Sequence, residues 1–116
     1  MSYVEGFVAA VPAAKKQAYL DHADKAAKLF REFGATRVVE GWGDDVPTGK
    51  VTDFHRAVDA KDGEIVVFSW IEFASKDARD KAWATLQEDP RMKELGNMPF
   101  DGKRMIIGGF DMILDA

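Results

Sequence analysis

Hydrophobic positions along this chain follow two spacings, which predict two kinds of element. Side chains alternate across a strand, whereas positions three or four apart share one face of a helix. Apolar residues at helical spacing between positions 13 and 33 are Tyr19, Ala23, Ala26, Phe30 and Phe33. We predict strands at 3–11, 36–45, 64–73 and 103–114, helices at 13–33 and 76–88, a short strand at 52–59 and a helical turn at 91–95.

Turn and cap residues mark the ends of these elements. Gly34 is typical of the left-handed residue that ends a helix. The pair Asp62-Gly63 indicates a tight turn between antiparallel strands. Ser75 is typical of a helix N-cap, and Pro90 interrupts the helix that follows it.

The order β-α-β-β-α-β is the ferredoxin-like arrangement, an α+β fold with two helices on one face of an antiparallel sheet. We expect residues 1–116 to form a single domain of this kind. In the strand 64–73, the side with Ile71 and Phe73 and the side with Phe68 and Trp70 are both apolar. Soluble monomers rarely expose such a patch, so we expect a homodimer that packs sheet against sheet.

Composition limits the partners that the chain binds. The net charge is −4, and nucleic-acid affinity needs clustered basic residues, so we expect no nucleic-acid binding. The chain has no cysteine, which excludes disulfides and thiolate metal ligands. No apolar run approaches the roughly 20 residues of a membrane span, and no signal region precedes the first strand. We expect a cytoplasmic protein without a bound metal or organic cofactor.

Candidate chemistry gathers in the stretch 42–58, between two predicted strands. Asp44 is a candidate for acid–base work, and turn formation is the alternative. His55 is a candidate general base because its ordinary pKa suits neutral pH, and an exposed loop histidine is the alternative. Trp42 supplies an apolar wall, and Arg56 is a candidate to hold an anionic group of a small-molecule ligand.

Carboxylates also alternate with aromatic residues along the predicted strands. Glu5, Glu40 and Glu72 each lie two residues from an aromatic side chain. If these positions point between two subunits, poor solvation raises the pKa of the carboxyl group, and Glu40 becomes a candidate catalytic acid. Ion pairing with arginine is the alternative. Trp70 and Arg104 complete the candidate set, as an apolar wall and an anion-binding group.

Longer motifs indicate a family. They are Tyr3-Val-Glu-Gly-Phe-Val8, Val39-Glu-Gly-Trp-Gly-Asp-Asp-Val-Pro47, Gly49-Lys-Val-Thr-Asp-Phe54, Val66-Val-Phe-Ser-Trp70, Asp89-Pro-Arg-Met92 and Met98-Pro-Phe-Asp-Gly-Lys-Arg-Met105. Over nearly the whole chain these motifs resemble the YbaA-like family of uncharacterised bacterial proteins. That family resembles part of the dimeric α/β-barrel superfamily, so the resemblance implies a ferredoxin-like fold and a homodimer. It implies no catalytic residues.

Three classes of function are compatible with the sequence. The first is a cofactor-independent small-molecule enzyme of isomerase or monooxygenase type, which rests on analogy with the superfamily. The second is a non-catalytic dimer that binds a small ligand or regulates another process. The third is an RNA-associated protein, which the acidic charge disfavours.

Overall fold

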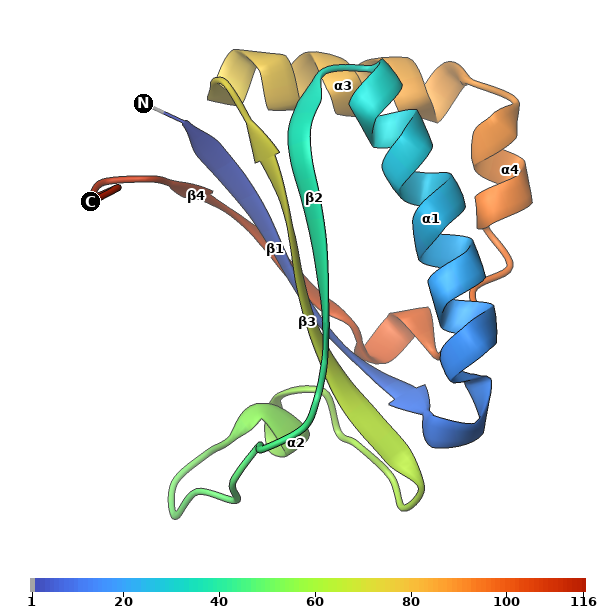
Figure 1. The fold of residues 1–116 in the computed structure, drawn as a ribbon, viewed down its shortest axis with the longest axis vertical. Helices are drawn as coiled ribbons and strands as arrows, with labels where there is room; N and C mark the ends of the chain where they lie inside the picture. The colour runs from blue at the N-terminus through green and yellow to red at the C-terminus, as the bar shows by residue number, and fades with distance from the viewer. Residues whose placement is uncertain (1) are drawn as a thin grey trace.

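A computed structural model describes residues 2–116, and its centre is one sheet of four antiparallel strands (Figure 1). The strands are β1 (Tyr3–Pro12), β2 (Ala35–Trp42), β3 (Glu64–Phe73) and β4 (Ile106–Asp111). They lie in the order β2-β3-β1-β4, so β2 and β4 form the two edges. This order with the intervening helices is the ferredoxin-like fold, which confirms the predicted α+β class.

The helices divide between the two sides of the sheet. The main helices α1 (Lys16–Glu32) and α3 (Lys76–Glu88) lie on one side together with the short α4 (Arg91–Leu95). The single-turn helix α2 (Phe54–Ala57) lies on the other side, at the end of the connection from β2 to β3. Two 3-10 turns, η1 (Ala13–Lys15) and η2 (Gly102–Arg104), precede α1 and β4.

Local sequence signals explain where these elements end. The Ser75 hydroxyl accepts a hydrogen bond from the Ala78 N–H at 3.1 Å, which caps the first turn of α3. Gly34 has φ of +120° behind α1, and Gly63 has φ of +82° in the turn before β3. Both conformations favour glycine because a Cβ atom would be strained there. The predicted cap and the predicted glycine at the end of the helix are confirmed. A turn forms at Asp62-Gly63, but it does not join two antiparallel strands, because the element before it is the helix α2.

The predicted strand at 52–59 was wrong, and the predicted strand at 103–114 was right only in part. The segment 52–59 contains the helix α2, because the Asp53 carboxylate accepts a hydrogen bond from the Arg56 N–H at 2.7 Å and caps a helical turn. The segment 103–114 is a strand at Ile106–Asp111 alone, since Asp101 caps the 3-10 turn η2 in the same way.

One side of the sheet, which we call the helix face, carries the main core. It includes the side chains of Phe7, Ala9, Glu40, Ser69 and Ile71. Phe73 of β3 and Leu86 of α3 are fully buried in this core, where α1 and α3 pack on the sheet. Burying such side chains is the dominant favourable contribution to folding.

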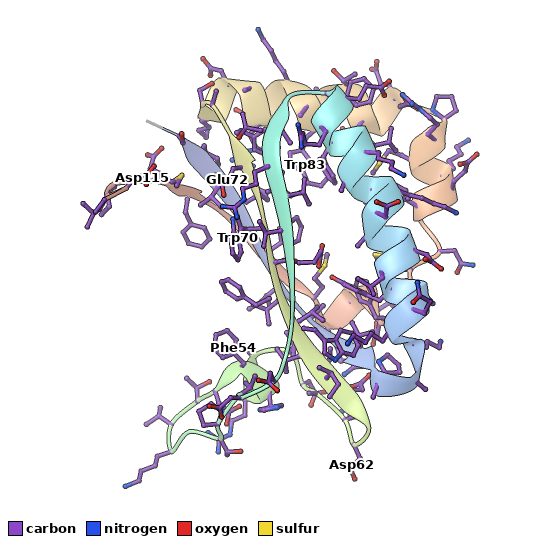
Figure 2. All side chains as sticks on the ribbon, viewed as in Figure 1. Phe54, Asp62, Trp70, Glu72, Trp83 and Asp115 are labelled. Carbon is purple, nitrogen blue, oxygen red and sulfur yellow. The ribbon has the colours of Figure 1, made fainter. Side chains whose placement is uncertain are left out.

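The opposite side, which we call the open face, carries Val4, Gly6, Phe68, Trp70 and Phe110. Near α2 it is covered, because Val58 is buried against Val66. Farther along it is exposed to solvent: Phe68 is 48% exposed and Phe110 is 59% exposed. Figure 2 shows Trp70 and Phe54 on this side, away from α1 and α3.

Candidate functional site

An interior cavity of about 180 Å³ lies between α1, α4 and the helix face of the sheet. Its apolar walls include Phe7, Phe30, Ile71, Met92, Met98 and Phe100. On α1 the lining residues Ala23, Ala26 and Ala27 are small. Because a helix normally packs larger side chains toward a sheet, these alanines leave room for the cavity.

Three polar side chains from three elements meet on the cavity wall. They are Tyr19 from α1, Glu40 from β2 and Ser69 from β3, which pairs directly with Glu40 in the strand register. The Tyr19 hydroxyl donates a hydrogen bond to Oε1 of Glu40. Ser69 lies close enough to both partners to influence the pKa of each as a hydrogen-bonding group. Tyr19 and Ser69 are buried, whereas Glu40 lies on an edge strand and keeps contact with solvent. Glu40 therefore stands at the mouth of the cavity.

The surroundings raise the pKa of Glu40. Desolvation by partial burial is the main cause, and the hydrogen bonds from Tyr19 and Ser69 oppose it by stabilising the carboxylate. The pKa of Tyr19 is raised as well, first by burial and then by the negative charge of Glu40. Tyr19 therefore remains a hydrogen-bond donor at neutral pH, and Glu40 is the group of this pair that can exchange a proton.

His22 connects the cavity to the segment that follows α3. Its Nε2 lies 2.8 Å from the backbone oxygen of Leu95 in α4, and its ring lines the cavity. Its positive form also favours the ionised state of Glu40. His22 thus fixes α4 over the cavity and contributes to the electrostatics of the carboxyl group.

The two candidate tryptophans lie on opposite faces of the sheet, so they do not line one pocket as predicted. Trp42 pairs with Val67 on the helix face, where its ring packs 6.3 Å from Tyr19 and lies under the Lys16 ammonium. Trp70 lies on the open face, and its indole N–H donates to Glu72 at 2.8 Å. Trp42 and Trp70 belong to different strands. Alternation along one strand fixes which of its own residues share a face, but it does not fix the face of a residue on another strand.

Among the predicted carboxylates, Glu5 and Glu40 point toward the helices, so the condition that they point between subunits is not met for these two residues. Glu5 is 4% exposed and pairs with Arg79 of α3 at 3.4 Å. Glu72 does lie on the open face, where Arg37 is its ion-pair partner at 3.6 Å.

Asp44 and His55 lie together, but away from the interior cavity. They line a small depression of about 110 Å³ beside the start of β3. Arg56 lies on α2 and forms an ion pair with the Asp53 carboxylate at 3.6 Å. These residues shape the connection from β2 to β3, and Asp53 also accepts the Gly49 N–H at 3.1 Å.

Arg104 has several protein partners. Its guanidinium donates to both carboxylate oxygens of Glu64 at 2.8 Å, to Asp101 at 3.1 Å and to the backbone oxygen of Asp59 at 2.7 Å. These bonds fasten η2 to the turn before β3. The hydrogen bonds from Arg104 lower the pKa of Glu64 to about 2. Because these partners occupy its guanidinium, Arg104 has a structural role.

Sequence reasoning missed Tyr19, His22, Ser69 and Trp83 as lining residues. Tyr19 was assigned to the apolar stripe of a helix, and its hydroxyl was not matched with a polar residue on a facing strand. Ser69 was an available signal, since it is a small polar residue on the otherwise apolar side of β3 that carries Ile71. Within residues 2–116, no three His, Asp or Glu side chains gather as metal ligands. No helix in the same range is long and apolar enough to cross a membrane.

This chain is similar to known proteins both in sequence and in fold. A family described as "Protein of unknown function (DUF1428)" matches residues 2–102. The uncharacterized protein YbaA of Escherichia coli K12 is 64% identical over 116 residues and covers 99% of each chain. A Shigella flexneri protein of the same name has the same identity and coverage.

A solved structure shares the fold. It is Rv0793 from Mycobacterium tuberculosis, with a TM-score of 0.56 over 100% of this chain and 99% of the other. The identity is 12%, so this likeness concerns the fold alone and transfers no site residues.

Proposed function

The chain belongs to the DUF1428 family, which includes the YbaA proteins, and we propose that it is a small-molecule enzyme that transfers a proton without a cofactor. The observation that carries this proposal is a polar cluster, Tyr19, Glu40 and Ser69, on the wall of an otherwise apolar cavity. Small-molecule sites typically combine apolar walls with a few convergent polar groups. Groups with a shifted pKa in such a cavity are candidates for catalysis.

The size of the cavity limits the substrate. A volume of about 180 Å³ is close to the roughly 150 Å³ of an engineered apolar cavity that binds benzene. The substrate is therefore compact, mostly apolar and provided with one hydrogen-bonding group that faces the polar cluster. A cyclic ketone the size of cyclohexanone meets these requirements.

The proposed chemistry is an isomerisation by proton transfer. The Glu40 carboxylate removes a proton from the carbon next to a carbonyl group, and the Tyr19 or Ser69 hydroxyl donates a hydrogen bond to the oxygen that gains negative charge. Glu40 then returns the proton to another carbon of the conjugated enolate, which moves the double bond of an unsaturated ketone, so the step needs no second reagent. In a saturated ketone such as cyclohexanone the proton returns to the same carbon, and the visible result is exchange with solvent. A raised pKa makes Glu40 a stronger base than a solvated carboxylate.

Deuterium exchange tests this chemistry directly. Wild-type protein in D₂O should incorporate deuterium next to the carbonyl of cyclohexanone, and mass spectrometry measures the rate. Glu40→Gln should reduce the protein-dependent rate about 100-fold or more while retaining ketone binding. Asp44→Asn is the matched control because Asp44 lines a separate depression. Binding without exchange in the wild type would favour the second candidate, a non-catalytic ligand-binding protein, and equal rates in both variants would remove Glu40 from the mechanism.

We also propose that two copies associate through the open face. Phe68, Ile106 and Phe110 are each 45% to 59% exposed there, and they surround a hollow of about 580 Å³ with Val4, Gly6 and Trp70. An apolar patch of this kind favours an interaction site. A second copy of the chain is the occupant that needs no further protein, and a two-fold axis places the same patch on both partners.

A further inference from the structure

A groove beside α3, distinct from the interior cavity, collects unpaired polar atoms. It lies between α3, β1 and β4 and has a volume of about 430 Å³. Across residues 2–116, the buried side-chain atoms with no hydrogen-bond partner are Oε2 of Glu5, Nε of Arg79 and Nε1 of Trp83. All three residues line this groove. Nε of Arg79 nevertheless forms an ion pair with Oδ1 of Asp80 at 3.1 Å, so the atoms left for a ligand are Oε2 of Glu5 and Nε1 of Trp83. Buried polar groups are nearly always paired, so two such atoms in one groove indicate a binding function.

The acceptor in this groove is a deeply buried carboxylate. Glu5 is 4% exposed, and its Oε2 lies 3.4 Å from Nη1 of Arg79 without the alignment of a hydrogen bond. Arg79 is held in place from another direction, because its Nη2 donates to the Tyr3 hydroxyl at 2.8 Å and its guanidinium lies over the Tyr3 ring. The geometry therefore leaves one acceptor on Glu5, next to an arginine that its other partners hold in place.

The charges restrict the chemical class of the ligand. Glu5 and Asp80 carry two negative charges around the single positive charge of Arg79, which is 3.1 Å from Asp80. An anion would be repelled by the carboxylates. A simple cation would satisfy Glu5 but would leave the N–H group of Trp83 without an acceptor.

We propose that this groove binds a neutral molecule with a primary carboxamide or urea group. The N–H of the ligand donates to Oε2 of Glu5, and its carbonyl oxygen accepts from Nε1 of Trp83. Ile107 and Ala84 also line the groove, and they give an aryl or alkyl substituent apolar contact. This second site goes beyond the proton-transfer function and does not depend on it.

Benzamide is the probe for this site, and the indole N–H signals report its binding. In a ¹H–¹⁵N NMR titration, the Trp83 signal should shift and reach saturation, and its absence from Trp83→Phe identifies it. The Trp70 signal should not move, because that N–H already donates to Glu72. Benzoate lacks the donor and carries a charge, so it should leave the Trp83 signal unchanged at the same concentration. An unchanged signal with benzamide, as expected if water alone fills the groove, would overturn the proposal.

Trp83 lines both the groove and the interior cavity, so a shift of its signal alone does not show which of the two binds benzamide. Variants separate the two locations. Glu5→Gln should weaken benzamide binding about tenfold, through the loss of a charged hydrogen bond. Ala84→Leu, at an exposed position of α3, should block the groove without disturbing the core. Thr85→Leu, exposed on the same helix and outside the groove lining, is the matched control and should bind normally.

Glu40→Gln decides between the two locations. Glu40 lines the cavity alone, so this variant should bind benzamide as the wild type does, whether or not Glu40 proves to be catalytic. Loss of benzamide binding in Glu40→Gln, with normal binding in Ala84→Leu, would place the probe in the cavity and overturn the groove site.

Discussion

The two faces of this sheet are built from alternate residues of the same strands, yet different structures cover them. On β3, Phe73 points to the helices and is completely buried, whereas Phe68 points to the open face and is 48% exposed. Both residues are phenylalanines on one strand, so the residue type at these positions does not distinguish the two faces. The helix face borders a cavity with a carboxyl group whose pKa is raised, whereas the open face presents an aromatic surface. The first face is suited to chemistry on a small molecule and the second to association with another chain.

The largest expected effect comes from truncating one phenylalanine on each face. Phe73→Ala should lower the free energy of unfolding by about 3–5 kcal/mol, because it leaves a cavity in the packed core. Phe68→Ala should cost less within one subunit, and its effect should depend on protein concentration if this side chain is buried in a dimer. Chemical denaturation at two protein concentrations measures both. Equal, concentration-independent losses would contradict the difference between the faces.

Charge insertion on the open face should disrupt the proposed dimer. Trp70→Asp should raise the dissociation constant about 100-fold or more, since an unpaired charge is costly in a dry interface. Light scattering of the wild type at micromolar concentration should give about twice the 12.9 kDa of one chain.

Leu20→Asp is the control for this experiment, because Leu20 is 45% exposed on α1, on the other side of the sheet. It should leave the dimer intact. A wild-type protein that is monomeric and soluble at this concentration would remove the basis for the interface.

The fold could be predicted because local signals agreed with one another. Strand alternation, the Ser75 cap and the glycine turns each specify a short stretch, and together they fix the ferredoxin-like order. The failure at 52–59 has a local cause. The Asp53 side chain caps a turn in the structure, but aspartate is also common in loops, so the sequence alone did not separate a capped helix from a turn beside a strand.

The candidate site was harder to predict, because it depends on contacts between distant elements. Tyr19 and Glu40 are 21 residues apart, and their contact requires both the helix orientation and the face of β2. The polar stretch 42–58 predicts a site at Asp44 and His55, which instead line a separate depression. The aromatic neighbours of Glu40 indicate its candidacy, but it stands beside Tyr19 because the bulge between Ala35 and Arg37 and the strand register set its direction.

A smaller effect is expected from the ion pair on the α2 side of the sheet. Arg104 lowers the pKa of Glu64 from 4.5 to about 2, so the folded state binds this proton less tightly than the unfolded state. The resulting stability is present above pH 4.5 and is lost as the pH falls toward 2. We expect about 1–2 kcal/mol to disappear over this range, and Glu64→Gln should remove that part of the pH dependence. Glu88→Gln, at an exposed position of α3, is the control and should leave the pH profile unchanged.

Glu40 should show the opposite sign with a smaller magnitude. Its pKa is raised above 4.5, so the folded state binds this proton more tightly, and stability falls as the pH rises through the interval between 4.5 and the folded pKa. Glu40→Gln should abolish this dependence, with a change below about 1 kcal/mol because solvent reaches the mouth of the cavity.

The pKa of Glu40 itself can be measured by following its side-chain carboxyl carbon in an NMR titration, and the midpoint should lie above 4.5. Tyr19→Phe should move the midpoint upward, because the Tyr19 hydroxyl stabilises the carboxylate in the wild type. Leu20→Ala, one residue away on the outer side of α1, adds no charge, controls for an unspecific effect of mutating this helix and should leave the midpoint nearly unchanged. A wild-type midpoint at or below 4.5 would mean that Glu40 is an ordinary solvated carboxylate. The enclosed face would then lose its proton-exchanging group, and the chemical distinction between the two faces would reduce to packing alone.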